Sequence, residues 1–317
     1  MTLKATLLAG AVALAPLAAM AADMTIGFSQ IGSESGWRAA ETTVTRQEAE
    51  ERGIDLKFAD AQQKQENQIK AIRSFIAQGV DGILLAPVVA TGWDEVLEEA
   101  KDAEIPVILM DRMVDADKGL FLTAVTSDLV HEGKVAGQWL VDEMAGAPCR
   151  IVELQGTTGS SPAIDRKAGF EQAIADHDNL EIVRSQTGDF TRAQGKVVME
   201  GFLKAEGPGN ICALYAHNDD MAVGAIQAIK EAGLVPGTDI RIVAIDAVPD
   251  AHLAIANGEM NATIELTPNM AGPALDALEA YLQNGVEPEK WIQTESKLYT
   301  AADDNRAVYE EKKGLGY

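Results

Sequence analysis

Short apolar runs alternate with amphipathic segments along most of the chain, from Met24 onward. The apolar runs have about six residues and the segments between them about 12 to 17, which is how strands alternate with helices in α/β folds. The order restarts near Asp128, so two doubly wound lobes are expected. The predicted strands are 24–29, 54–60, 81–87 and 105–111 in the first half, and 149–156, 181–189, 211–218 and 239–246 in the second.

The first 22 residues have the features of a secretory signal peptide. Lys4 precedes an apolar run from Ala5 to Ala18, and small residues follow it. The run is shorter than the ~20 residues that a membrane helix needs, so cleavage is expected after Ala21 or Ala22. About 295 residues then remain outside the cytoplasm, which is more than one average core holds and favours two lobes.

The charge balance is strongly acidic. Asp and Glu number 49 against 26 Lys and Arg, which gives a net charge of −23. Such a surface repels phosphate backbones and anionic lipid heads, so binding to nucleic acid or to a membrane surface is not expected. No stretch after the leader approaches ~20 apolar residues, so no membrane insertion is expected either.

The cysteines and histidines limit the possible covalent and metal chemistry. Cys149 and Cys212 each lie beside a short apolar run, and in an oxidising compartment two neighbouring strands could place them in one disulfide. The histidines show no ligand spacing, so no metal site is expected. They are His131, His177, His217 and His252.

The loop GSESG at 32–36 raises the question of catalysis. A nucleophile elbow needs Gly-x-Ser-x-Gly, but the central residue here is Glu34. Neither Gly-x-x-x-x-Gly-Lys-Ser/Thr nor Gly-x-Gly-x-x-Gly occurs, so a nucleotide cofactor is not expected. A secreted hydrolase is therefore disfavoured. We expect that the protein is not an enzyme and that it binds no cofactor.

Polar and aromatic residues gather where the predicted strands end. In doubly wound folds ligands bind beyond the carboxyl ends of the strands. Carboxylates, amides and arginines match the hydroxyls of a polyol, and an aromatic ring covers its C–H face. Two of the aspartates could instead cap the next helix and the tryptophan could belong to the core. The candidates are Asp111, Arg112, Arg166, Asn218 and Asp246, with Trp37 and Phe190 as aromatic walls.

These motifs resemble those of the periplasmic sugar-binding proteins of the ribose- and galactose-binding family. The resemblance covers essentially the whole mature chain and rests on MTIGFSQIGSESGW, ILMDR, DRKAGF, TGDFTRAQG, YAHNDDMAVGA, AIDAVPD and ATIELTPNMAGPA. It is strongest to members that bind galactofuranose, through GSESGWRAAET, QQKQENQIKA, APVVATGW, GDFTR, AHNDDM and ELTPNMAGPA.

The resemblance implies the type I periplasmic binding protein fold, in which two Rossmann-like lobes are joined by a hinge of three chain crossings. The expected N-terminal lobe comprises residues 23–126 and 267–294. The expected C-terminal lobe comprises residues 127–266 and 295–317. The crossings are expected near Thr126, near 265–267 and near 294–298.

The resemblance also assigns roles in sugar binding. Trp37 would stack on a sugar face, and Arg38 stands where ribose binders usually have a second aromatic residue. A guanidinium there offers fixed donors that suit the exocyclic tail of a hexofuranose. Glu265 stands near a glutamine of ribose binders, and a one-residue shift would turn its side chain away. The implied sugar contacts are Glu34, Trp37, Arg38, Asp111, Arg112, Arg166, Phe190, Asn218, Asp246 and Glu265.

The resemblance implies a monomer in the periplasm that captures a monosaccharide and delivers it to the inner-membrane permease of an ABC importer. Galactofuranose or a related furanose or pentose is the expected ligand. Ribose, arabinose, galactose and a role as a loaded chemoreceptor ligand are the alternatives. The effector domain of a transcription regulator is disfavoured, because it would begin with a DNA-reading helix-turn-helix and lack a signal peptide.

Overall fold

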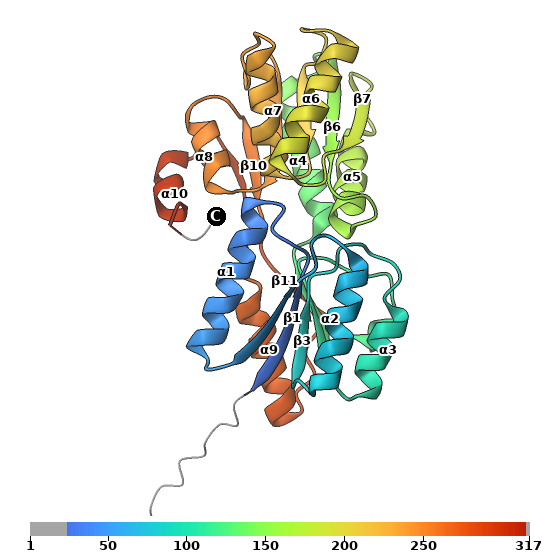
Figure 1. The fold of residues 1–317 in the computed structure, drawn as a ribbon. Coiled ribbons are helices and arrows are strands. Elements are labelled where there is room, and N and C mark those ends of the chain that lie inside the picture. Colours follow the sequence, from blue (N-terminus) through green and yellow to red (C-terminus); the bar gives the residue numbers. More distant parts are fainter. Residues whose placement is uncertain (1–23, 315–317) are drawn as a thin grey trace, which may run out of the picture.

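Two α/β lobes, each built on a six-stranded sheet, make up the protein in the computed structural model, which describes residues 24–314 (Figure 1). The predicted signal peptide lies outside the described residues. Both sheets have the same strand order, with the first strand of the lobe between its second and third. This is the doubly wound order of parallel α/β sheets. The expected fold class is thereby confirmed.

All neighbouring strands of the first sheet run parallel, in the order β11-β5-β4-β3-β1-β2. The β3 sequence GILL and the β4 sequence VILM are buried at every position, as expected for strands covered by helices on both faces. The strands are β1 (Thr25–Gln30), β2 (Asp55–Asp60), β3 (Gly82–Leu85), β4 (Val107–Met110), β5 (Thr123–Thr126) and β11 (Trp291–Gln293).

The second sheet repeats this arrangement in the order β12-β10-β9-β8-β6-β7. Its strands are parallel except β12, which pairs antiparallel with β10 at the edge. The strands are β6 (Cys149–Gln155), β7 (Leu180–Thr187), β8 (Ala213–Ala216), β9 (Arg241–Asp246), β10 (Ala262–Glu265) and β12 (Leu298–Thr300).

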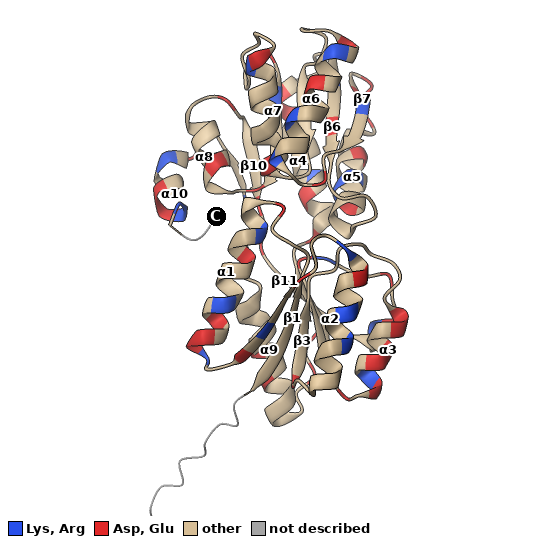
Figure 2. Cartoon of the chain, viewed as in Figure 1, with Lys and Arg blue, Asp and Glu red and all other residues tan. Residues whose placement is uncertain are grey.

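Helices cover the sheets and carry much of the charge, as α1, α3 and α10 show in Figure 2. No helix within residues 24–314 is both long enough and apolar enough to cross a bilayer. The first lobe has α1 (Gly36–Glu51), α2 (Gln65–Gln78), α3 (Asp94–Asp102), the 3-10 turn η1 (Lys118–Leu120) and α9 (Ala271–Asn284). The second has α4 (Leu129–Met144), α5 (Ser161–Ile174), α6 (Arg192–Glu206), α7 (Asp219–Glu231), α8 (Pro249–Ala256) and α10 (Asn305–Lys312).

Five helices begin at the carboxyl edges of the sheets with a side-chain cap, among them α1, α5 and α7. Ser35, Ser160 and Asn218 each accept a hydrogen bond from the backbone N–H three residues later. Such caps satisfy an N–H group that the helix itself leaves unpaired. The loops that face the opposite lobe are therefore fixed at α1, α5 and α7.

The chain passes between the two sheets three times. It leaves the first sheet after Thr126, where β5 ends, and enters α4, which packs on α5 and the second sheet. It returns after Glu265, where β10 ends, because α9 packs against α1, β4 and β5. It crosses again between β11 and β12, over residues 294–297. These connections form the joint between the lobes.

The predicted disulfide is present. Cys149 begins β6 and Cys212 immediately precedes β8, the strand that pairs with β6. The Cα atoms are 5.4 Å apart, within the range that a disulfide spans.

Replacing both cysteines with serine is expected to lower the free energy of unfolding by about 2–3 kcal/mol, because the bond closes a long loop in the unfolded chain. Denaturant unfolding of the mature protein measures the change. Reduction of the wild type should reproduce the loss, while the double variant should be insensitive to reductant. A wild type and variant of equal stability would contradict the prediction.

Candidate functional site

A cleft lies between the lobes, at the facing carboxyl edges of the two sheets, and nine of the ten residues predicted to contact a ligand line it. Three further lining residues were not predicted from the sequence: Ser35, Pro162 and Leu266. The nine are Glu34, Trp37, Arg38, Asp111, Arg112, Arg166, Phe190, Asn218 and Asp246.

Glu265, the tenth predicted contact, is not brought to the cleft. Its Oε1 accepts a hydrogen bond of 2.7 Å from Nζ of Lys312, and it lines a separate pocket with Thr267 and Pro268. The next residue, Leu266, lines the cleft instead. Successive side chains of extended backbone point to opposite sides, so the one-residue shift decides which of the two faces the cleft.

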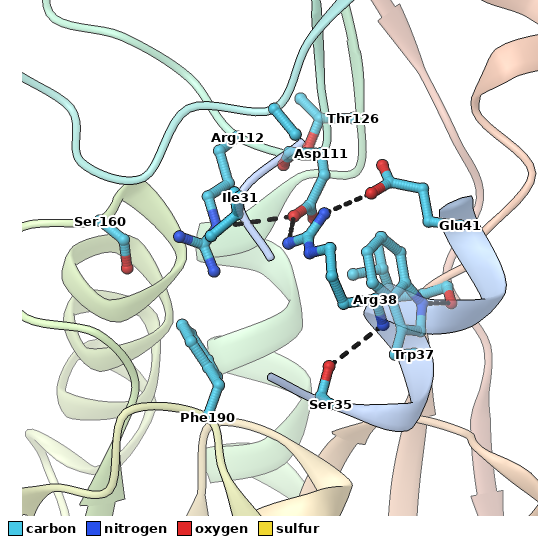
Figure 3. A network of polar contacts seen from close by, with 12 residues as sticks. Ile31, Ser35, Trp37, Arg38, Glu41, Asp111, Arg112, Thr126, Ser160 and Phe190 are labelled. Carbon is cyan, nitrogen blue, oxygen red and sulfur yellow. Dashed lines mark hydrogen bonds and ion pairs between the residues drawn. The ribbon is translucent and has the colours of Figure 1, made fainter. Parts of the chain in front are cut away.

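Arg38 is the centre of a buried ionic cluster in the first lobe (Figure 3). Its Nη1 and Nη2 donate to Glu41 and Asp111, and its Nε donates to Oε1 of Glu34 at 3.2 Å. Burial by itself lowers the pKa of Arg38, but these carboxylates raise it above its ordinary value. Each of the three guanidinium nitrogens therefore donates to a carboxylate within the protein, which accounts for three of its five N–H groups.

Glu41 is a functional candidate that the sequence analysis missed. It is fully buried, and its Oε2 also accepts a hydrogen bond of 2.9 Å from Nε2 of Gln30. Its signal was its position three residues after Arg38 on the same helix, which places the two side chains on one face. Glu41 does not line the cleft. It holds the guanidinium of Arg38 from behind.

Arg112 presents a second guanidinium. Its Nη1 donates to the carbonyl of Val88 at 2.9 Å, and its carbon Cζ lies 5.1 Å from the ring centroid of Phe190. Its Nε is buried without a hydrogen-bond partner. Burial, and then the charge of Arg38, lower the pKa of Arg112 to about 10. The side chain stays charged at neutral pH.

Arg166 is the corresponding cation of the second lobe. Its Nε donates to Oε2 of Glu132 at 2.9 Å and its Nη1 to the carbonyl of His217 at 2.6 Å. Its Nη2 is buried without a hydrogen-bond partner, 3.8 Å from Oδ1 of Asp246. Burial raises the pKa of Asp246 above its ordinary value, although Arg166 opposes the rise.

The aromatic walls are held by neighbouring polar groups. Nε1 of Trp37 donates to the carbonyl of Leu266 at 2.7 Å, and Cζ of Arg38 lies 4.8 Å from the tryptophan ring. Nδ2 of Asn218 donates to the carbonyl of Phe190 at 3.1 Å. The indole of Trp37 is thus held by its own hydrogen bond, and Asn218 holds the backbone that carries Phe190.

The backbone is strained at this site. Asp111, Phe190 and Asp246 have positive φ angles of 65°, 60° and 125°. Such conformations cost about 1–3 kcal/mol each in non-glycine residues, and they persist where the surrounding structure enforces them. Their concentration at one cleft is typical of a functional site.

Three buried atoms of the cleft have no hydrogen-bond partner: Oε2 of Glu34, Nε of Arg112 and Nη2 of Arg166. They supply one acceptor and two donors, a combination that matches hydroxyl groups. The free space between the side chains is only about 20 Å³, room for about one water, so a sugar requires the cleft to widen.

The charge of the cleft disfavours an anionic ligand. Three arginines line it together with the carboxylates of Glu34 and Asp111, while burial favours the neutral form of the third acidic residue, Asp246. Glu41 and Glu132 add two buried carboxylates directly behind the arginines. The donor and acceptor set therefore suits a neutral polyol.

The chain is similar to known binding proteins over most of its length. The periplasmic binding protein domain family matches residues 26–285. The chain is 64% identical to the galactofuranose-binding protein YtfQ of Escherichia coli over 94% of each chain. It is 32% identical to the ribose import binding protein RbsB of Bacillus subtilis over 88% of each.

Solved structures agree with the sequence relatives. A crystal structure of a galactofuranose binding protein superposes with a TM-score of 0.91 at 63% identity, covering 93% of this chain and all of the other. The binding protein of the arabinose ABC transporter from Shewanella sp. ANA-3, bound to α- and β-L-arabinofuranose, has a TM-score of 0.89 at 57% identity, covering 92% and 96%.

Proposed function

Because the chain belongs to the periplasmic binding protein domain family, we propose that it captures a neutral monosaccharide, galactofuranose or a related furanose or pentose, for an ABC importer. The observation that carries the proposal is the cleft, where both lobes contribute buried arginines with unpartnered nitrogens. The sugar would bridge the lobes and favour the closed state, because only closure lets both sets of contacts form.

The relatives support a furanose in particular. One bears the name of a galactofuranose-binding protein, and one structure holds arabinofuranose. The aromatic rings of Trp37 and Phe190 offer faces to the C–H groups of such a ring. The buried carboxylates behind the arginines oppose sugar acids and sugar phosphates. Another aldose is the second candidate, since ribose is named in several more distant relatives.

The remaining features of the proposal follow the family. The leader would be removed near Ala21 or Ala22, and a monomer would deliver its sugar to inner-membrane permease subunits rather than transform it. We place the lobe boundaries at the three crossings, with residues 23–126 and 267–294 in the first lobe. The second would comprise residues 127–266 and 295–317, of which 315–317 lie outside the described residues.

Titration calorimetry on the mature protein tests the ligand. Galactofuranose is expected to bind with micromolar affinity or better, about −8 kcal/mol, and more tightly than galactopyranose or ribose. L-Arabinose is expected to bind through its furanose form. Ribose binding more strongly than any furanose would contradict the proposed ligand, and the absence of binding by every sugar would contradict the proposed function.

The two cleft aspartates are expected to differ in their response to neutralisation. Asp111→Asn should weaken sugar binding by about 10- to 100-fold, because it removes the charged partner of Arg38. Asp246→Asn should cost less than about tenfold, because burial already favours the neutral form of that group. Calorimetry of both variants decides the order, and a larger loss at Asp246 would contradict it.

A further inference from the structure

Glu132 lies behind the cleft on α4 and is fully buried, although it does not line the cleft. Its Oε2 accepts the hydrogen bond from Nε of Arg166. Its Oε1 accepts hydrogen bonds from two hydroxyl groups, Oγ of Ser127 and, at 3.4 Å, Oγ of Ser296. One carboxylate therefore joins a cleft arginine to two serines.

The two serines belong to different crossings between the lobes. Ser127 follows β5 in the first crossing, and Ser296 lies between β11 and β12 in the third. The second crossing is also connected to the cleft, because the carbonyl of Leu266 accepts the hydrogen bond from Trp37. Each crossing is thus bonded to a cleft side chain, either directly or through Glu132.

We propose that Glu132 is a positioning residue that couples the orientation of Arg166 to the first and third hinge crossings. The inference rests on the proposed function, because the bound sugar would accept the hydrogen bond from Nη2 of Arg166. A buried carboxylate keeps its partners, since leaving the charge unpaired is unfavourable. A sugar that holds the guanidinium of Arg166 in one orientation therefore also holds the carboxylate of Glu132. That carboxylate in turn restricts the two hinge crossings that contain Ser127 and Ser296.

A double-mutant cycle tests this coupling. Ser127 touches neither the cleft nor Arg166, yet Ser127→Ala is expected to weaken sugar binding by about tenfold, because it removes a hydrogen bond to the charged group that holds Arg166. In the Glu132→Gln background the same serine change should alter affinity by less than about twofold, because the coupling passes through the carboxylate. An equal effect in both backgrounds would overturn the proposal.

Small-angle scattering of sugar-free protein supplies a second readout. Ser127→Ala should shift the balance between open and closed forms, whereas a merely structural role would leave it unchanged. If Glu132→Gln does not fold, Ser296→Ala replaces it as a test. Like Ser127→Ala, it should weaken sugar binding. Unchanged binding in both serine variants would overturn the proposal.

The control is Ser185→Ala, at a more exposed position than Ser127. Ser185 also donates to a buried carboxylate, that of Glu153, but inside the second lobe and away from the crossings. Its removal should leave sugar affinity and lobe closure unchanged. A wild type that binds no sugar would contradict the proposed function, whereas a wild type that binds while Ser127→Ala behaves like Ser185→Ala would contradict only this inference.

Discussion

Replacing Arg166 with methionine is expected to weaken sugar binding by at least about 100-fold and to lower the free energy of unfolding by about 3–5 kcal/mol. The affinity falls because the cleft loses the unpartnered Nη2 of the second lobe. The stability falls because the carboxylate of Glu132 stays buried without its cation. Calorimetry and denaturant unfolding of the same preparation measure the two effects.

Arg150→Met is the matched control for this variant. Arg150 lies half-exposed in the same lobe and pairs with Glu206, which keeps a second cation, Arg184. Exposed ion pairs contribute little, so affinity should be unchanged and stability should change by less than about 1 kcal/mol. An Arg166→Met protein that binds sugar like the wild type would remove Arg166 from the proposed site.

Gly133→Ala is expected to lower the free energy of unfolding by about 3 kcal/mol or more and to weaken sugar binding. A Cβ atom at Gly133 would lie 2.1 Å from the carbonyl oxygen of Arg166, so α4 and α5 would have to separate. These helices carry Glu132 and Arg166, and their separation would pull apart the ion pair behind the cleft. Unfolding measurements and calorimetry test both effects.

Gly201→Ala gives the opposite sign and serves as the control. Gly201 lies inside α6, and a Cβ atom there would meet nothing within 4 Å. Alanine should raise the free energy of unfolding by about 0.5–1 kcal/mol, because it restricts the unfolded chain and favours the helix. Equal responses at Gly133 and Gly201 would show that steric contact between α4 and α5 does not decide the outcome.

Local patterning was enough to predict most of the strands, but not the short ones that lack a continuous apolar run. The eight predicted strand segments correspond to β1–β4 and β6–β9. Four strands were not predicted: β5, β10, β11 and β12, which have four, four, three and three residues. The equally short β3 and β4 are continuous apolar runs, whereas these four mix polar with apolar residues and show no clear period. They pair with strands that are distant in the sequence, so a short stretch of sequence does not reveal them.

The residues of the candidate site could also be predicted only in part. Seven residues near strand ends could be proposed from the sequence because the carboxyl edge of a parallel sheet is where ligands bind, and all seven line one cleft. Two more lining residues, Glu34 and Arg38, were proposed only from the resemblance. The resemblance to known sugar binders sharpened this choice. Glu265 does not line the cleft because its neighbour Leu266 faces it instead. The direction of one side chain in extended backbone depends on register rather than on composition.

The sequence alone determined the two-lobed α/β class, the pairing of Cys149 with Cys212 as a possibility, and the residues that would meet between the lobes. Only the tertiary structure decided which atoms are already bonded. It showed that all three nitrogens of Arg38 donate to carboxylates, and that Glu132 holds Arg166, 34 positions away, and Ser296, 164 positions away. The physical reason is that short-range periodicity encodes helices and strands, whereas the partner of a buried charge is set by elements that are distant in the chain and packed together only in the fold.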